Sequence, residues 1–252
     1  MLKNTTLLIT GASRGLGAAI ARSASRHGAR VIVNYWQSEK AAQALVAELG
    51  ERALAIRADV RSAAEVHAMV RQAVDWAGRP VNALVNNALV NYQFNGDARH
   101  SLDTISWDAM QLQIDGAVRG SLNTLQACRG GMQTVGGGQV VNIGTNLFQN
   151  PVVPYHDYTA AKGALLALTR TAAAEWGPQG IRVNMVSGGL LRSTDASAAT
   201  PDEVFDMIAA GTPLRQVTTP EEMADAVVML LSPLARGITG QNLVVDGGLV
   251  MN

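Results

Sequence analysis

Residues 5–17 read TTLLITGASRGLG, and this stretch decides the fold. Its first part, residues 5–10, is a short apolar run ended by a glycine, which is typical of a buried strand. From Gly15 onward Ala and Ile recur at helical spacing as far as His27, and Gly28 follows as a C-cap. The glycines let a phosphate approach the backbone, and the helix N-terminus offers it free N–H groups. We therefore expect a nucleotide at this turn, although glycines in a tight turn also have purely structural uses.

The alternation of strand and helix continues along the chain. The patterns predict strands at 5–10, 30–34, 53–58, 82–85, 139–143, 182–186 and 243–245, and helices at 15–27, 38–49, 62–76, 107–132, 158–176 and 221–231. Strands that are nearly all apolar and alternate with helices form parallel sheets covered on both faces. We predict an α/β fold, a Rossmann-type doubly wound sheet of about seven strands. No repeat or linker divides the chain, so residues 1–252 are expected to form a single domain.

Two polar stretches interrupt this alternation, at 91–106 and 188–213. Both follow the carboxyl ends of strands, where open α/β sheets bind ligands, so they are candidate walls of a substrate site. The second holds a short helical run at 204–210. Aromatic side chains and a histidine that would shape an apolar pocket are Tyr92, Phe94, Phe148, Tyr155 and His156.

Composition excludes several classes of partner. The chain has 20 basic and 20 acidic side chains, so no positive surplus exists to bind nucleic acid. A single cysteine, Cys128, cannot form an internal disulfide, and no apolar run is long enough for a membrane span. The sequence therefore predicts a cytoplasmic protein with a small-molecule partner, no nucleic-acid or membrane partner and no metal site.

The charge pattern of the second strand favours NADP(H) over NAD(H). NAD enzymes usually place an acid at the end of this strand for the ribose hydroxyls, and here the position holds Asn34. A 2′-phosphate meets no carboxylate there and would pair with Arg14. The alternative is that Arg14 is an ordinary solvated side chain and Asn34 a turn residue at the strand end. Asp59 ends the third strand, where it would bind an adenine amine or simply cap the next helix.

Tyr158 and Lys162 lie four residues apart, on one face of a predicted helix. A phenol with an ordinary pKa of about 10 exchanges protons poorly at neutral pH, and a nearby ammonium should lower that pKa. Thr145 follows the fifth strand, where its hydroxyl would orient a substrate carbonyl or merely complete a turn. Tyr155 has no lysine four residues later, and His156 is expected before the helix and off this face.

Together these residues resemble the short-chain dehydrogenase/reductase family over nearly the whole chain. Residues 10–17 look like its T-G-x-x-x-G-x-G turn, residues 86–88 like its N-N-A-G stretch and 158–162 like its Y-x-x-x-K. Residues 33–38 are similar to the 3-oxoacyl-acyl-carrier-protein reductase group. The resemblance implies catalytic roles for Tyr158, Lys162 and Thr145. Cofactor contacts are expected at Gly11, Ser13, Arg14, Gly15, Leu16, Gly17, Asn34, Tyr35, Asp59, Val60, Asn86, Asn87, Ala88, Tyr158, Lys162, Gly189, Leu191 and Thr194, with Ser193 as an alternative to Thr194.

The resemblance implies that NADPH delivers hydride to a ketone or 3-oxoacyl carbonyl while Tyr158 donates the proton. Lys162 would hold the nicotinamide ribose. The chain departs from the family pattern in several places. Threonine replaces serine at 145, Leu89 and Gly144 replace a glycine and a serine, and Gly188 replaces a proline. The helix asparagine that supports a proton-relay water aligns with Ala117.

These departures keep a second hypothesis open, a nucleotide-binding scaffold with weak or no catalysis. Enoyl reductases of related fold use a wider tyrosine–lysine spacing than this chain has. The resemblance also implies homotetramers or homodimers. Small residues on the helix after Tyr158, such as Ala161 and Ala164, would allow close helix contact across a two-fold axis or inside the monomer.

Overall fold

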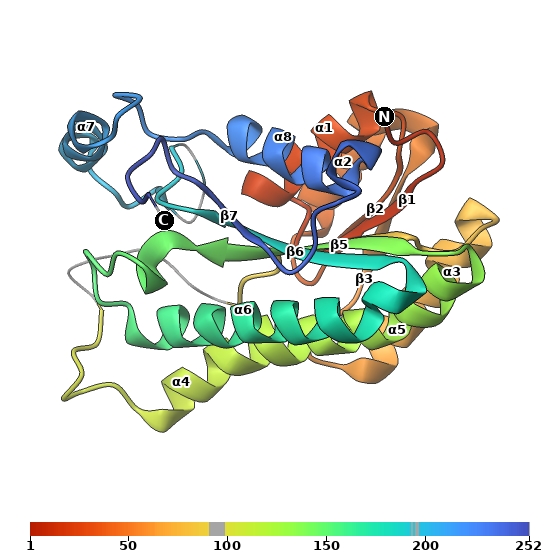
Figure 1. Ribbon diagram of the computed structural model, residues 1–252, viewed down its shortest axis with the longest axis horizontal. Coiled ribbons are helices and arrows are strands. Elements are labelled where there is room, and N and C mark those ends of the chain that lie inside the picture. Colours follow the sequence, from red (N-terminus) through yellow and green to blue (C-terminus); the bar gives the residue numbers. More distant parts are fainter. Residues whose placement is uncertain (91–98, 193, 195–196, 252) are drawn as a thin grey trace.

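The computed structural model describes residues 1–90, 99–192, 194 and 197–251 (Figure 1). Seven parallel strands form one sheet in the order β3-β2-β1-β4-β5-β6-β7. The strands are β1 (Thr6–Ile9), β2 (Arg30–Tyr35), β3 (Ala53–Arg57), β4 (Ala83–Asn86), β5 (Gly138–Thr145), β6 (Ile181–Gly188) and β7 (Asn242–Val245). The predicted fold class is confirmed. Strand order reverses between β1 and β4, so the loops after these strands diverge and open a crevice for a ligand.

Helices cover both faces of the sheet (Figure 1). α1, α2 and α8 lie on one face, and α3, α5 and α6 lie on the other. The α-helices are α1 (Gly15–Arg26), α2 (Glu39–Leu49), α3 (Ala63–Ala77), α4 (Trp107–Ile114), α5 (Gly120–Thr134), α6 (His156–Trp176), α7 (Asp202–Gly211) and α8 (Pro220–Leu231). Short 3₁₀ helices are η1 (Gly50–Arg52), η3 (Asn146–Phe148), η4 (Gly177–Gln179) and η6 (Pro233–Ala235).

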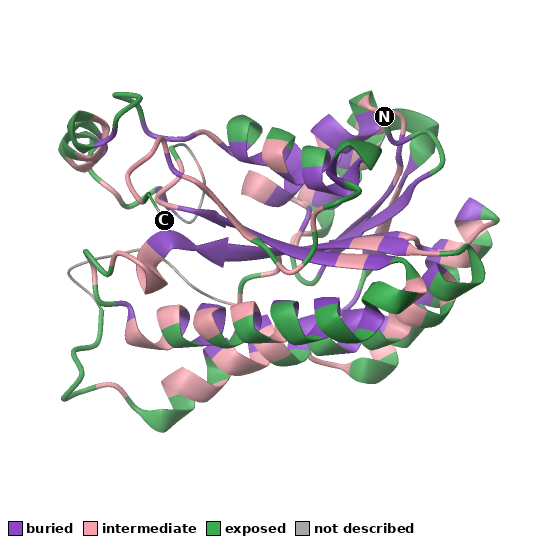
Figure 2. Ribbon diagram, viewed as in Figure 1, coloured by how far each residue is buried: buried purple, intermediate pink, exposed green. Residues whose placement is uncertain are grey.

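The apolar core is split by the sheet into two clusters. Successive side chains of a strand point to opposite faces, so Leu7 and Ile9 pack on the α1/α8 side and Leu8 packs on the α3/α5/α6 side. Figure 2 shows the central strands mostly buried, with exposed residues on the outer sides of the helices, while β7 at the edge of the sheet is of intermediate burial. This burial on both faces explains why the strands are apolar runs without alternation.

Two sequence predictions about helices are wrong. The continuous helix expected at 107–132 is divided into α4 and α5 by a π-helical segment, η2 (Asp115–Arg119). α6 begins at His156, two residues before the predicted start, so His156 is not outside the helix. Asp157 lies in its first turn and accepts the N–H of Tyr158 at 2.8 Å, which suits a carboxylate at a helix N-terminus.

The candidate substrate walls are described only in part. Residues 91–98, which include Tyr92 and Phe94, lie outside the described residues, as does Ser193. The second stretch carries α7, which is longer than the helical run predicted at 204–210. In the described ranges of the chain, no helix has the length and apolarity needed to cross a membrane.

Candidate active site

The turn between β1 and α1 requires its glycines. Gly11 and Gly15 have φ angles of +61° and +54°, a region that favours glycine. A Cβ added at Gly17 would lie 2.5 Å from the carbonyl oxygen of Gly11, so no side chain fits there. The turn therefore has no side chains at these glycine positions, and a ligand can approach its backbone closely.

Hydrogen bonds to the residues that follow β4 hold this turn in place. The Thr10 hydroxyl accepts the backbone N–H groups of Asn87 and Ala88 at 2.9 and 3.0 Å. The Asn87 amide donates to the carbonyls of Thr10 and Gly11 at 2.9 and 3.0 Å. Thr10 and the Asn87 side chain thus stabilise the turn, a structural role that the sequence did not reveal.

The N-terminus of α1 suits a phosphate group. Its first turn contains no acidic residue, and the side chain of the N-cap residue, Arg14, does not cap its N–H groups. Arg14 is exposed at the N-cap, Ser13 lies beside it in the turn, and Leu16 packs on the α1/α8 core. Thr194 reaches this turn from the segment after β6, because its Cβ lies 3.8 Å from where a Cβ of Gly15 would be. The residues present therefore fit a dinucleotide.

The side chains at the ends of β2 and β3 already have protein partners. Asn34 is buried, accepts the N–H of Gly11 at 3.2 Å and donates to the Ala58 carbonyl at 3.0 Å. The Asp59 carboxylate binds the Arg61 guanidinium at 2.7 Å, which lowers the pKa of Asp59. Neither interaction was foreseen from the sequence. Nucleotide contacts by these two residues stay predictions.

Tyr35 and Val60 complete this side of the crevice. Burial is the main cause that raises the pKa of Tyr35, and the nearby Glu39 carboxylate acts in the same direction. Val60 is buried, and its carbonyl accepts the Asn123 amide at 2.8 Å. A Cβ on Gly120 would lie 2.8 Å from Val60, so the helix after the π segment packs directly against this residue.

Tyr158, Lys162 and Thr145 come together at the carboxyl end of β5. All three side chains are buried, and Thr145 is hydrogen-bonded to Tyr158. The Lys162 ammonium lies 5.7 Å from the centre of the Tyr158 ring and donates to the Ile143 carbonyl at 2.6 Å. The expected shared face of the helix is present.

The expected lowering of the Tyr158 pKa is not found. Burial raises the pKa of Tyr158 to about 12, and the hydrogen bond with Thr145 opposes this only in part. Burial also lowers the pKa of Lys162 to about 8. The sequence spacing had suggested that attraction between the ammonium and a phenolate would set these pKa values. The loss of water around both buried groups has the larger effect.

Asn86 faces the core through its side chain. Its amide donates to Asn142 at 2.8 Å, its oxygen accepts the Thr124 hydroxyl at 2.6 Å, and Asn142 donates to Thr169 at 2.8 Å. These buried bonds join β4 and β5 to α5 and α6 directly below the site. Asn142, a polar residue within the apolar strand at 139–143, is the sequence signal that could have revealed this network.

The departures from the family pattern have visible packing reasons at some positions. A Cβ on Gly144 would lie 2.3 Å from the Ser187 hydroxyl, and one on Gly188 would lie 2.8 Å from the Met223 sulfur. Ala117 lies in the π segment, where it and Lys162 line a small cavity of about 10 Å³. Leu89 is partly exposed, at 37%.

The C-terminal segment reaches the turn that follows Thr145. Asn146 donates to the buried Asp246 carboxylate at 2.9 Å, and a Cβ on Gly189 would lie 3.0 Å from the same Asn146 amide. Leu191 packs partly on the α1/α8 core. Strands β5, β6 and β7 thus contribute neighbouring loops to one edge of the site.

Comparison with known proteins supports this arrangement. A family model described as enoyl-(acyl carrier protein) reductase matches residues 11–250. The 3-oxoacyl-acyl-carrier-protein reductase of Staphylococcus epidermidis is 33% identical over 251 residues, which are 98% of this chain and 100% of that protein. The corresponding reductase of Synechocystis is 34% identical over 251 residues, covering 97% of this chain and 96% of that protein.

Solved structures show the same fold. The 3-ketoacyl-(acyl-carrier-protein) reductase from Brucella melitensis, complexed with NADH, has a TM-score of 0.89 and 26% identity, with 100% of both chains covered. A variant of a short-chain dehydrogenase/reductase from Serratia marcescens has a TM-score of 0.87 and 30% identity over 98% of both chains. The chain belongs to the short-chain dehydrogenase/reductase family of oxidoreductases.

Proposed function

We propose that this protein is an NADP(H)-dependent reductase that converts a ketone or 3-oxoacyl carbonyl to a secondary alcohol. The observation that carries the proposal is the buried group of Tyr158, Thr145 and Lys162 at the end of β5. It lies at the same edge of the sheet as the glycine turn after β1, where residues fit a dinucleotide.

Each of the three side chains has a distinct task in this reaction. When bound, the nicotinamide supplies the hydride. The Tyr158 hydroxyl, which is protonated at neutral pH, donates its proton to the carbonyl oxygen. The Thr145 hydroxyl, next to Tyr158, orients the carbonyl oxygen. Lys162 stabilises the phenolate that forms and holds the nicotinamide ribose.

The preference for NADP(H) rests on charge near the end of β2. No acid occupies position 34, and exposed Arg14 stands at the N-cap of α1. Arg57, at the end of β3, stacks on the Trp36 ring at 4.0 Å and adds positive charge beside the residues that follow β2. The Brucella relative is described with NADH, so NADH is the alternative that the test must separate.

Arg14→Gln should weaken NADPH binding by about tenfold or more, because a charge-assisted bond to the 2′-phosphate is lost. NADH binding should change little. Fluorescence titration of both nucleotides measures this, with the exposed Arg71→Gln as the charge-matched control. Equal weakening for the two nucleotides would mean that Arg14 does not recognise the 2′-phosphate.

Tyr158→Phe should lower turnover by about 100-fold or more while NADPH binding is kept, because the proton donor is removed. Oxidation of NADPH is followed with a panel of ketones, 3-oxoacyl thioesters and enoyl thioesters. Tyr155→Phe, a buried tyrosine one turn earlier, is the matched control and should keep most activity. If wild-type protein binds NADPH and reduces no carbonyl compound, the scaffold hypothesis replaces this proposal.

We further infer a homo-oligomer, a dimer or tetramer, with small-molecule substrates. Large apolar side chains are exposed on α4 and α5, including Trp107 at 67% and Leu122 at 40%. On α6, Ala161 is buried in the monomer, whereas Ala164 is exposed and could pack against a second copy. The cytoplasmic location expected from the sequence stays a prediction.

A further inference from the structure

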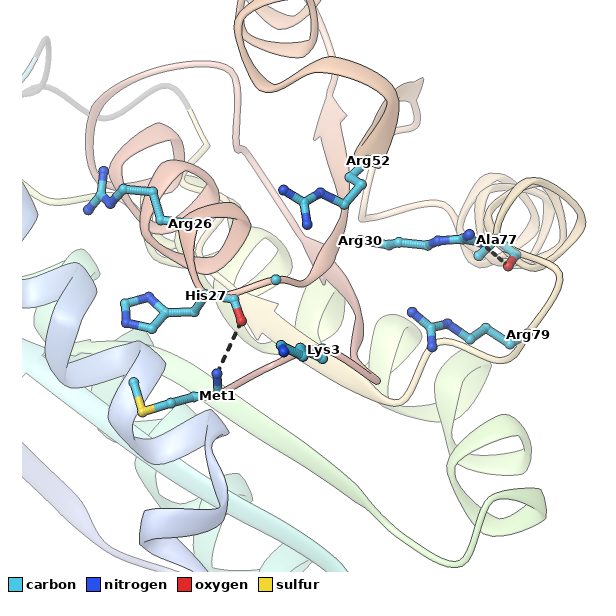
Figure 3. Close-up of a pocket in the computed structure, with 9 residues that line it drawn as sticks. Met1, Lys3, Arg26, His27, Arg30, Arg52, Ala77 and Arg79 are labelled. Atoms are coloured by element: carbon cyan, nitrogen blue, oxygen red, sulfur yellow. Dashed lines mark hydrogen bonds between the residues drawn. The ribbon is translucent and has the colours of Figure 1, made fainter.

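A basic pocket lies at the amino ends of the central strands, at the edge of the sheet opposite to the dinucleotide turn. It is a cavity of about 680 Å³ beside the end of α1 and the starts of β1, β2 and β3 (Figure 3). Cavities of this size hold small molecules in other proteins. The residues that line it are Met1, Lys3, Arg26, His27, Gly28, Arg30, Arg52, Ala77 and Arg79.

The charged side chains that line this pocket are all positive. Five lining side chains are cationic, from segments before β1, at the α1–β2 turn, before β3 and after α3, and no lining residue is Asp or Glu. In the part of the chain that the structure describes, the recorded salt bridges involve other residues. The whole chain has equal numbers of acidic and basic side chains, so this is a local excess.

Helix electrostatics account for only part of the excess. Arg26 ends α1, where a cation interacts favourably with the last carbonyl groups. Arg52 ends η1, directly after α2, and Arg79 follows the end of α3, so both also lie near helix carbonyl ends, whereas Lys3 precedes β1 and has no such helix of its own. In Figure 3 the charged ends of these three side chains face the same open space. Their mutual repulsion is a cost that a bound anion would remove.

Two of the guanidinium groups are fixed in place by the protein. Arg30 donates to the Ala77 carbonyl and lies 6.0 Å from the centre of the Trp76 ring. The Nε of Arg79 donates to the Thr6 hydroxyl at 3.0 Å, and the hydrogen bonds of the described residues leave its Nη groups for a ligand. Fixed guanidinium groups lose little freedom when they bind phosphate, which favours affinity.

Glycine keeps the floor of the pocket open. Gly28 has a φ angle of +96°, and a Cβ there would lie 3.2 Å from the Lys3 side chain. A side chain at this position would strain the turn and crowd Lys3. The turn is therefore shaped so that Lys3 and the arginines surround a space that no protein side chain fills.

We propose that this pocket binds a small molecule carrying several phosphate groups, at a site separate from the dinucleotide turn. Arginine forks match phosphate oxygens in pairs, and several of them suit an oligophosphate better than a single carboxylate. The cations surround one cavity and do not form an extended ridge, which favours a compact ligand over a nucleic-acid backbone.

The test is calorimetric titration with inorganic tripolyphosphate at low ionic strength, with the nucleotide turn filled by excess NADPH. The pocket variant is Lys3→Gln/Arg52→Gln, which removes two exposed charges. The control, Arg71→Gln/Arg236→Gln, removes two exposed charges outside the pocket. Wild type and control should bind alike, and the pocket variant at least about tenfold more weakly. Equal unfolding temperatures will show that all variants are folded.

Four results would overturn the proposal. The first is no binding of tripolyphosphate to wild type, and the second is an equal loss of affinity in the pocket and control variants. The third is a glutamate-rich peptide that binds the pocket while tripolyphosphate does not, which would make it a protein-docking surface. If Arg14→Gln abolishes tripolyphosphate binding without NADPH and the pocket variant does not, the anion binds only at the dinucleotide turn.

Discussion

Burial decides how the two central side chains titrate. Tyr158 has a pKa of about 12, so it stays protonated near neutral pH, but it is a weak acid and needs a nearby positive charge to stabilise the phenolate when it gives up its proton. Lys162 has a pKa of about 8, so its ammonium is mostly charged at pH 7 and neutral at pH 9. Lys162 is therefore the group whose titration should limit reduction on the alkaline side.

Reduction by wild-type protein should fall as the pH rises through about 8, because the Lys162 ammonium loses its charge there. The same deprotonation has the opposite effect on folding. The pKa of Lys162 is lower in the folded chain than in the unfolded chain, so between pH 8 and 10.5 the unfolded chain binds more protons. The contribution of Lys162 to the free energy of unfolding therefore rises over this pH range. Turnover at saturating substrate and urea unfolding, both measured from pH 7 to about 9.5, check the two trends.

Lys162→Met is the control for this titration. It should have low turnover without the step near pH 8, and its unfolding free energy should lack the corresponding rise. Wild-type turnover that stays level through pH 9.5 would show that the Lys162 charge is not required.

The proximity of single site residues was predictable where their spacing in the sequence determines it. The i, i+4 spacing of Tyr158 and Lys162 and the position of Thr145 after a strand bring them together as expected. Their pKa values were not predictable, because they depend on elements far away in sequence that exclude water. Asn34 and Asp59 show the same limit, since their partners are the Gly11 turn and the Arg61 guanidinium.

Among the elements, the α4–α5 segment differs most from its sequence pattern. A π segment adds one residue to a helical turn without altering the apolar spacing enough to be noticed. Its cause is close packing with residues distant in sequence. A Cβ on Gly116 would lie 2.5 Å from Val90, and one on Gly120 would lie 2.8 Å from Val60. The helix approaches the strand ends at the site only because these two positions lack side chains.

Gly120→Ala should destabilise the protein by about 1–3 kcal/mol, because the new methyl group collides with Val60. It should also weaken nucleotide binding, since Val60 is the proposed contact on the adenine side. Gly130→Ala in the same helix is the matched control, with no atom within 4 Å of the new Cβ. The control should be stabilising by about 0.5–1 kcal/mol. Thermal unfolding and NADPH titration measure both, and identical effects of the two substitutions would contradict this packing argument.

At the scale of the whole molecule, the sheet was predictable because each strand is an apolar run between helices of clear period. All seven strands lie within a few residues of their expected positions, since glycines such as Gly28 and Gly50 mark where helices end. The basic pocket was not predictable. Its cations come from segments as far apart as Lys3 and Arg79, and the parallel register of β1, β2, β3 and β4 brings them together.

Self-association is the remaining question at this scale, and the exposed apolar side chains of α5 give a direct test. Leu122→Arg should shift the protein to a smaller species, because a charge would have to be buried when two copies pack through this helix. Leu234→Arg places the same charge at a more exposed leucine after α8 and should leave the mass unchanged. Light scattering during size-exclusion chromatography gives the masses. A wild-type monomer at micromolar concentration, or equal dissociation by both substitutions, would show that the α5 face is not the contact between subunits.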